Sequence, residues 1–354
     1  MPHTTASIIM KRILSLGFLL AGLALLLGSC QDDSTNMRKK ITGKAGELVV
    51  VVPTPTWEGA TGKRFREVMA QPQLGLPQEE PIFDLIAVPP SAFKEIFKTS
   101  RNIVQIKIST TIDSSKVEFK KDIWAWPQAV VNIQAKSTED FNQLFDQYSD
   151  RIVAYMLRAE RDRLQLNYKK YHDKAAKNVI RDKFNIELNV PPGFKVTKER
   201  DDFAWVRYET PDISQGILIH TYPYTSDSTF TENYILNKRD SILQAHVEGP
   251  ADGSYMTTEH QLPAIFNVFE LRKNYAAETR GLWKVEGDYM GGPFINLTVL
   301  DAANNRIVML DGYVYAPRFD KRNLLRQVEA MVYSVEFPDQ QKNDKITSQA
   351  KMGN

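Results

Sequence analysis

Cysteine is almost absent from this sequence, because Cys30 is the only one among 354 residues. A single thiol excludes an intramolecular disulfide bond and a metal centre built from several thiolates. Histidine is also scarce, with five in the chain. His172, His220, His246 and His260 stand too far apart for any short metal-binding motif. The sequence therefore predicts no metal and no cofactor, and the fold must depend on its hydrophobic core.

Long hydrophobic runs are rare as well, and the one over Ile13–Leu27 follows two basic residues. As a helix this run spans roughly 22 Å, which is short of the roughly 30 Å hydrocarbon core of a bilayer. Such a run after a short basic start is typical of a secretion signal. It ends in Leu27-Gly28-Ser29-Cys30, which resembles the lipobox of bacterial lipoproteins. We expect residues 1–29 to be removed and Cys30 to carry the lipid, for example palmitate. An ordinary cleaved signal beside a chance cysteine is the alternative.

Neither sign of charge is in excess. The chain has 45 basic and 43 acidic residues, and the predicted leader contains two of the basic ones, so 43 of each sign remain. A neutral body has no long-range field that attracts a polyphosphate backbone, and no basic stripe interleaved with aromatic residues is present in the sequence. We therefore expect no nucleic acid partner.

Polar segments flank the predicted body at both ends. Residues 30–45 contain few apolar side chains, and this composition predicts a flexible tether. The polar residues 339–354 predict a disordered tail. Asp32-Asp33, close behind Cys30, resembles the export signal that sends Bacteroidota lipoproteins to the outer face of the outer membrane. We expect the protein to be lipid-anchored at the outer membrane, at the cell surface or otherwise on the periplasmic face.

The first folded unit is predicted over residues 46–172. It opens with Glu47–Val52, a β-branched run typical of a strand buried on both faces. A capping sequence at Ser137 begins a long helix with apolar residues at helical spacing. The second half of that helix, residues 160–174, is dominated by charge, so we expect an exposed bridge between two domains. Further strands are expected near residues 83–88, 103–109, 117–126 and 129–135.

The second folded unit is predicted over residues 173–338. Residues 184–190 alternate apolar and polar, which predicts a strand with one buried face. Strands are also expected near residues 203–208, 216–222, 265–273, 282–286, 294–300 and 306–315, with helices after residue 229 and over residues 320–333. Helices packed on largely antiparallel sheets define an α+β fold. We therefore predict two α+β domains, each a largely antiparallel sheet with packed helices, joined by the long helix.

Two segments resemble a known family. Residues 46–53 with Trp57-Glu58-Gly59, and residues 311–317, are similar to domain-of-unknown-function family 4837, a group of uncharacterised Bacteroidota lipoproteins. This resemblance would cover nearly the whole mature chain. It implies a location in the cell envelope but no activity. Separately, the order of elements over residues 184–337, through Pro192-Gly193-Phe194, is similar to PsbP-like α/β/α sandwiches. That similarity implies a binding or assembly module and no enzyme.

Catalytic motifs are incomplete in this sequence. Gly59–Arg64 lies between a strand and a helix as a phosphate loop would, but it lacks the first glycine and the final hydroxyl residue of that motif. Ser91 and Lys94 have the spacing found in penicillin-binding proteins, without the companion motifs. Glu79 and Glu80 could form an acid–base pair or lie in a solvated loop, and we favour the loop.

Tryptophans are the candidate binding residues. Trp124 and Trp126 would project from one face of the predicted strand 117–126, where they could hold a sugar ring or an apolar partner, or pack in the core. Trp57 is expected in an exposed loop. We therefore predict a membrane-anchored envelope lipoprotein that is a non-catalytic binding or assembly module for a protein or glycan partner. An unrecognised envelope hydrolase is the alternative, and the oligomeric state stays open.

Overall fold

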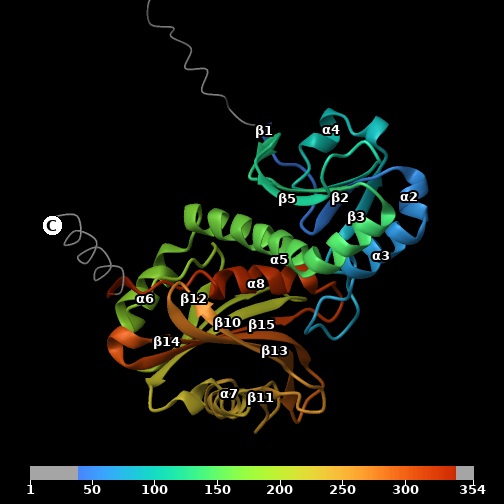
Figure 1. The fold of residues 1–354 in the computed structure, drawn as a ribbon. Coiled ribbons are helices and arrows are strands. Elements are labelled where there is room, and N and C mark those ends of the chain that lie inside the picture. The colour runs from blue at the N-terminus through green and yellow to red at the C-terminus, as the bar shows by residue number, and fades with distance from the viewer. Residues whose placement is uncertain (1–38, 340–354) are drawn as a thin grey trace, which may run out of the picture. The chain divides into compact units, whose positions relative to one another are not determined.

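The first sheet of the computed structural model, which describes residues 39–339, has the strand order β3-β2-β4-β7-β5. Its strands β2, β3 and β5 are labelled in Figure 1. Its strands are β2 (Glu47–Val51), β3 (Asp84–Val88), β4 (Asn102–Ile108), β5 (Lys116–Lys121) and β7 (Ala129–Ala135). The pairs β2–β3, β2–β4 and β4–β7 are parallel, and β5–β7 is antiparallel. The prediction of a largely antiparallel sheet is therefore wrong for this region. The physical reason is that its chain returns through long crossovers, which place successive strands in the same direction.

Apolar side chains cover both faces of this first sheet. Leu48 and Val50 of β2 belong to a core that includes Phe65, whereas Val49 and Val51 belong to a second core on the opposite face. This burial explains the uninterrupted β-branched run, because a strand in a parallel sheet is covered on both sides. The smaller elements of the region are β1 (Lys39–Lys40), α2 (Thr54–Glu58), α3 (Ala60–Met69), η1 (Pro90–Ala92), α4 (Glu95–Lys98) and β6 (Ala125–Trp126).

The long helix α5 (Thr138–Lys170) begins where the capping sequence predicted, since the side chain of Ser137 accepts a hydrogen bond from the backbone N–H of Asp140. Its charged second half is not an exposed bridge. Glu160 is 3% exposed and Arg163 8%, and this half of α5 lies against α8 (Arg322–Val332). The prediction failed because these charges are paired: the Glu160 carboxylate accepts from Arg163 at 2.7 Å.

The second sheet is antiparallel throughout its main path, β11-β13-β14-β15-β10-β9-β8, with β12 paired to β13. The strands are β8 (Lys195–Glu199), β9 (Phe203–Glu209), β10 (Ser214–Pro223), β11 (Tyr255–Thr258), β12 (Ile265–Leu271), β13 (Asn274–Glu286), β14 (Gly291–Asp301) and β15 (Arg306–Tyr315). The accompanying helices are α6 (Lys174–Phe184), η2 (Asp227–Phe230), α7 (Glu232–His246), η3 (Ala302–Asn304) and α8. The α+β class, with two domain-like regions, is confirmed.

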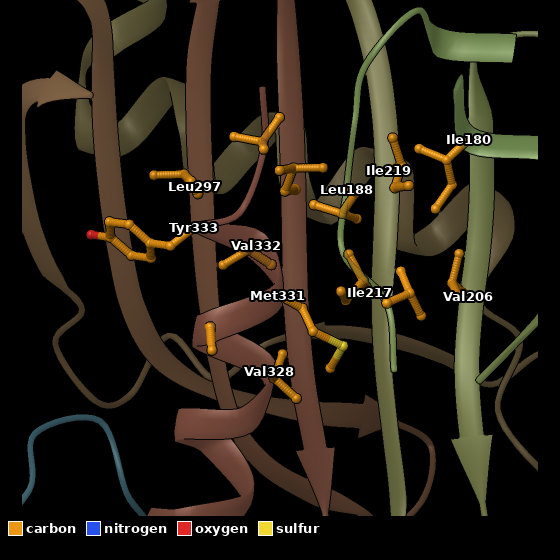
Figure 2. Packing of buried hydrophobic residues seen from close by; sticks show 14 of the residues in the cluster. Ile180, Leu188, Val206, Ile217, Ile219, Leu297, Val328, Met331, Val332 and Tyr333 are labelled. Carbon is orange, nitrogen blue, oxygen red and sulfur yellow. The ribbon is translucent and has the colours of Figure 1, made fainter. Parts of the chain in front are cut away.

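Helices lie on both faces of the second sheet (Figure 1). On one face, Val328, Met331 and Val332 of α8 pack against Ile217 and other aliphatic residues of the strands (Figure 2). A Cβ added at Gly312 of β15 would lie 2.2 Å from Val328, so the glycine allows α8 to approach the sheet closely. The helix α7 covers the opposite face, over a core that contains Ile235, Leu243 and Trp283.

The alternating segment at residues 184–190 is only partly as predicted. Ile186, Leu188 and Val190 are fully buried, as the alternation indicated. The segment is not a regular strand, however: Phe184 ends α6, and Asn185 adopts a left-handed conformation with φ of 49°. A single bridge between Glu187 and Glu336 replaces a continuous ladder, because the preceding helix and its left-handed cap use the first residues of the segment.

The loop that contains Glu79 and Glu80 is not simply solvated. Glu80 is 7% exposed, and its carboxylate accepts hydrogen bonds from the backbone N–H groups of Lys321 at 2.6 Å and Arg322 at 2.9 Å. It therefore caps the N-terminus of α8, where unpaired N–H groups and the helix dipole favour a negative charge. Arg322 in turn contacts Asp84 of β3 at 2.7 Å. These contacts belong to residues 40–354, which form one compact unit.

The predicted tether is shorter than expected at its C-terminal end. The backbone N–H of Ile41 donates to the carbonyl of Trp126, and that of Thr42 donates to the carbonyl of Thr99. These hydrogen bonds hold a polar segment on the body although it contributes little to the core. The predicted signal peptide, Cys30, the predicted tether up to residue 38 and residues 340–354 of the predicted tail lie outside the described residues. None of the helices in residues 39–339 is long and apolar enough to span a bilayer.

Candidate binding pocket

An aromatic-lined pocket of about 470 Å³ opens on the second sheet, beyond the end of α7. The helix ends at His246, so strands β9, β10, β13 and β15 are not covered by it at this position. Pockets of this size and apolar lining are the usual binding places for small ligands or side chains of a partner. The lining includes Trp205, Arg207, Ser214, Val247, Met256, Trp283, Val285, Met290, Tyr313 and Tyr315.

Glycines lie opposite two aromatic residues of the pocket across the strands. Gly216 of β10 pairs with Tyr313 of β15, and Gly292 of β14 pairs with Trp283 of β13. A Cβ at Gly216 would lie 2.3 Å from the Tyr313 ring, and one at Gly292 would lie 2.1 Å from the carbonyl oxygen of Val314. The aromatic rings can therefore lie over the glycine backbone, where they also shield it from solvent.

Hydrogen bonds among the lining residues satisfy the polar atoms of the pocket floor. Trp205 Nε1 donates to the Tyr313 hydroxyl at 3.2 Å, and Trp283 Nε1 donates to the Val314 carbonyl at 3.2 Å. The Ser214 and Tyr313 hydroxyls lie 3.3 Å apart. Burial raises the pKa of Tyr313 above its ordinary value, so the phenol stays neutral. The floor consequently offers ring faces and hydrocarbon to a ligand.

Charge is confined to the rim of the pocket. The Arg207 guanidinium lies 4.7 Å from the centre of the Trp205 ring and pairs with Glu209 at 3.2 Å. Trp205 and Tyr315 are half-buried, whereas Trp283 and Tyr313 are each 2% exposed. The outer aromatic pair can therefore contact a ligand directly, and the inner pair supports the floor.

The structure does not bring the predicted tryptophans together. Trp57 lies in helix α2 and not in an exposed loop, and its half-buried ring packs near Phe65 with the Arg66 guanidinium 4.6 Å from its centre. A five-residue helix that starts at Thr54 replaces the expected loop, because Pro55 suits the first turn. None of Trp57, Trp124 and Trp126 lines the aromatic pocket.

Trp124 and Trp126 do not share a strand. The strand β5 ends at Lys121, and Asp122 has a positive φ of 57°, which turns the chain before Trp124. Trp124 packs edge-on against Phe93 at 5.5 Å, whereas Trp126 is 37% exposed beneath the ammonium group of Lys40 at 4.5 Å. Alternation within a continuous strand was therefore the wrong basis for pairing them.

Sequence reasoning missed Trp205 and Trp283, although a usable signal was present. Trp205 lies among buried residues of β9, and Gly291-Gly292 begins the strand β14. Glycine inside a strand often marks the close approach of another group. The pairing of that glycine with an aromatic residue depends on register, which no local pattern supplies.

A histidine–carboxylate pair lies elsewhere on the second region. His260 Nε2 and Asp240 Oδ2 are 2.6 Å apart, and the other Asp240 oxygen accepts from the Thr258 hydroxyl at 2.7 Å. His260 is exposed, and neither it nor Asp240 lines the aromatic pocket. Within residues 39–339, no group of three or more His, Cys, Asp and Glu side chains is arranged to hold a metal ion.

His220 is a buried side chain of β10 and lies outside the pocket. It is 6% exposed beside Tyr222, with its Nδ1 3.8 Å from an Asp202 oxygen. Burial lowers the pKa of His220 to about 4, and Asp202 only partly opposes this effect. A neutral imidazole in this position fits a packing role.

Comparison with solved structures gives distant similarities. The yeast Ran-binding protein Mog1p from Saccharomyces cerevisiae is 9% identical over 43% of this chain and 90% of its own, with a TM-score of 0.31. A point mutant of Mog1 is 10% identical over the same shares, with a TM-score of 0.27. No curated protein matches the chain.

Two domain families account for the described body. Residues 173–334 match the domain of unknown function DUF4837, and residues 41–169 match a different domain of unknown function, DUF8532. The expectation that the first family would cover nearly the whole mature chain is corrected, because its match begins at residue 173 and so excludes the segment around Trp57. The chain thus contains a DUF8532 domain followed by a DUF4837 domain.

Proposed function

We propose that this protein is a lipid-anchored envelope protein of the outer membrane that acts as a non-catalytic binding module, with the aromatic pocket as its binding site. The partner is a protein or a glycan of the envelope. The observation that carries the proposal is the pocket itself, in which a half-buried tryptophan and tyrosine stand at the mouth of an apolar hollow. Such aromatic groups are enriched where proteins bind partners.

The anchoring part of the proposal is supported by the N-terminal sequence. The apolar run over Ile13–Leu27 is too short to cross a bilayer, and it leads directly to Cys30 in a lipobox-like sequence. A lipid on Cys30 would hold the body close to the membrane while leaving the pocket accessible to other envelope components.

The non-catalytic part is supported by the chemistry of the pocket floor. The polar atoms of Trp205, Trp283 and Tyr313 are engaged with each other or with backbone, so they position rings and supply no activated nucleophile. Arg207 is paired with Glu209 at the rim. These features suit recognition of an apolar or ring-shaped group.

A hydrolase is the second candidate, and the His260–Asp240 pair is the observation that favours it. An aspartate that accepts from an imidazole is the arrangement that orients a general base. In this protein the same carboxylate also accepts hydrogen bonds from the backbone N–H and the hydroxyl of Thr258. These bonds connect helix α7 to strand β11, which is a structural role.

The anchoring claim is tested with the full chain in the cell. The Cys30→Ser variant should lose labelling by radioactive palmitate and should either remain as a precursor or leave the membrane fraction. Equal labelling of variant and parent would overturn the lipoprotein proposal.

The binding claim is tested with the purified lipoprotein on envelope extracts and on panels of envelope glycans. Trp205→Ala should abolish capture of a specific partner, whereas Trp126→Ala, an exposed tryptophan outside the pocket, should retain it. Unchanged capture by Trp205→Ala would refute the pocket as the site. Turnover of an envelope substrate that His260→Ala abolishes would establish the hydrolase instead.

A further inference from the structure

A second cavity, of about 220 Å³, lies between α5 and α8 and is separate from the aromatic pocket. Its lining comes from both sheet-bearing regions, with the loop at residues 71–74 and helix α5 on one side and strands β12 and β13 and helix α8 on the other. Ligand sites form preferentially at such junctions. Three arginines border this cavity: Arg161, Arg280 and Arg326.

The acidic residues at the cavity are already engaged with cations. Glu329 accepts from Arg161 at 3.0 Å and pairs with Arg280 at 3.0 Å. Glu278 holds the guanidinium of Arg280 with two contacts, at 2.8 and 2.9 Å. Glu160 also borders the cavity, but Arg163 and other groups outside the cavity hold its carboxylate. Glu329 and Glu160 favour the charge of Arg326 only at longer range, since each carboxylate is in direct contact with other arginines.

Arg326 is the exception in this network. It is 7% exposed, and its Nη2 atom donates to the Gln73 side chain at 3.0 Å and to the Ile82 carbonyl at 2.6 Å, neither of which carries charge. Its Nε and Nη1 atoms are buried without a hydrogen-bond partner. The ring of Phe83 lies beside it, with its centre 5.5 Å from the guanidinium carbon. A buried guanidinium is normally paired, because an uncompensated charge in the interior is costly.

Arg326 remains a cation at neutral pH. Burial lowers the pKa of its guanidinium to about 10, and the positive charge of Arg322 acts in the same direction. The protein therefore holds a charged guanidinium with two unpartnered donors beside a cavity that is large enough for a small ion.

We propose that this cavity binds a small oxyanion, a phosphate or a carboxylate group, through the free Nε and Nη1 donors of Arg326. These two N–H groups lie on opposite edges of the planar guanidinium, so each donates singly to an oxygen of the anion after rotation about the last torsions of the side chain turns it toward the cavity. Arg161 and Arg280 also border the cavity, but both are paired with Glu329. Glu278 and Glu329 pair with Arg161 and Arg280, and the bound anion would supply a negative charge for Arg326.

Binding here would hold the two regions together. The site needs Gln73 and Arg161 from the first region and Arg326 from the second, so a bound anion favours the arrangement in which all three are close. The proposal does not depend on the aromatic pocket, and each can fail without the other.

The test uses the full lipidated protein in detergent with inorganic phosphate, at an ionic strength held constant with chloride. Phosphate should raise Tm in proportion to ln(1 + c/Kd), where c is the phosphate concentration, by about 4 °C at a hundredfold excess over Kd, and calorimetry should give one site per chain. Arg326→Gln should weaken binding at least tenfold. Arg318→Gln, which removes an exposed arginine paired with Asp212, should bind phosphate as the parent does.

Further arms identify the source of the anion and cover a folding failure. Acetate and glycerol phosphate, titrated in the same way, distinguish a carboxylate, a free phosphate and a phosphorylated headgroup by which binds most tightly. If Arg326→Gln does not fold, Arg326→Lys keeps the charge without the guanidinium N–H donors and should bind more weakly than the parent. The absence of saturable binding by all three probes, or the same response to phosphate in Arg326→Gln and the parent, overturns the proposal.

Discussion

The two sheets of this protein differ in how completely their faces are covered by other segments. In the first, parallel pairs such as β2–β3 and β2–β4 are connected through crossovers, and both faces are filled by apolar residues. In the second, antiparallel strands are connected in part by short turns, and α7 covers one face incompletely. A parallel sheet needs a covering segment between strands, whereas a hairpin does not. The open end of the antiparallel sheet is where the aromatic pocket forms.

The two regions also differ in their buried charges. In the second region Arg239 of α7 contacts Asp311 of β15 with two hydrogen bonds, at 2.6 and 3.3 Å, and Asn296 donates to the same carboxylate. This network lies within one region. The capping of α8 by Glu80 instead connects a loop of the first region to a helix of the second. Stability within a region and coupling between regions therefore rest on different residues, and each can be changed separately.

The largest effect is expected from Arg239→Met. The variant leaves Asp311 buried without its cation, and we expect the free energy of unfolding to fall by about 3–5 kcal/mol. Urea denaturation measures the loss, and hydrogen exchange should locate it in the second sheet. Arg318→Met, at an exposed ion pair, should change stability by less than about 0.5 kcal/mol. A loss spread equally over both sheets would contradict the separation of the two regions.

A smaller effect is expected from Glu80→Gln. The neutral amide lacks the negative charge that caps α8. Its NH2 group also replaces one of the two accepting oxygens and so faces a backbone N–H, donor against donor. The free energy of unfolding should therefore fall by about 2–3 kcal/mol. The decisive readout is hydrogen exchange at the N-terminal turn of α8 and at β3, which should rise together. Glu79→Gln is the matched control, because that neighbouring glutamate is exposed. If the control behaves like Glu80→Gln, loop charge and not the helix cap explains the effect.

The smallest of the three effects concerns His220 and pH. The folded-state pKa of His220 is lowered to about 4, against an ordinary value of 6.5, so the unfolded chain binds a proton that the folded chain refuses. The contribution of His220 to stability is therefore fully present above about pH 6.5 and is lost as pH falls toward 4. Between about pH 7 and pH 5 the loss should be about 2 kcal/mol.

The variant His220→Gln isolates that contribution. Denaturation of parent and variant at each pH should show a smaller loss for the variant over this window, whereas His172→Gln, at a partly exposed histidine, should follow the parent. Parallel pH profiles for parent and His220→Gln would show that the buried imidazole is not the titrating group.

Local patterns correctly predicted the features that depend on residues close in sequence. Ser137 begins α5 as its capping sequence indicated, because the cap involves a backbone N–H three residues away. The β-branched run of β2 is buried on both faces, and Ile186, Leu188 and Val190 are buried together even though their segment is not a regular strand. The antiparallel second sheet and the α+β class also follow from such periodicities.

The predictions that failed concern features that depend on contacts between residues far apart in sequence. Glu80 is buried only because Arg322, 242 residues later, brings a helix N-terminus to it. The charged half of α5 is buried because α8 packs on it, and the pairing of Trp124 with Trp126 fails at a single left-handed residue, Asp122.

The sequence by itself determined most of the element types and most of the core, since these follow from composition and short-range periodicity. Tertiary structure alone decided which charges are buried and where the pocket lies. Gly216 meets Tyr313 and Gly292 meets Trp283 only in one register of the antiparallel ladder. Register is set by the packing of the whole sheet against its helices, so no segment contains the information that places these rings over glycine.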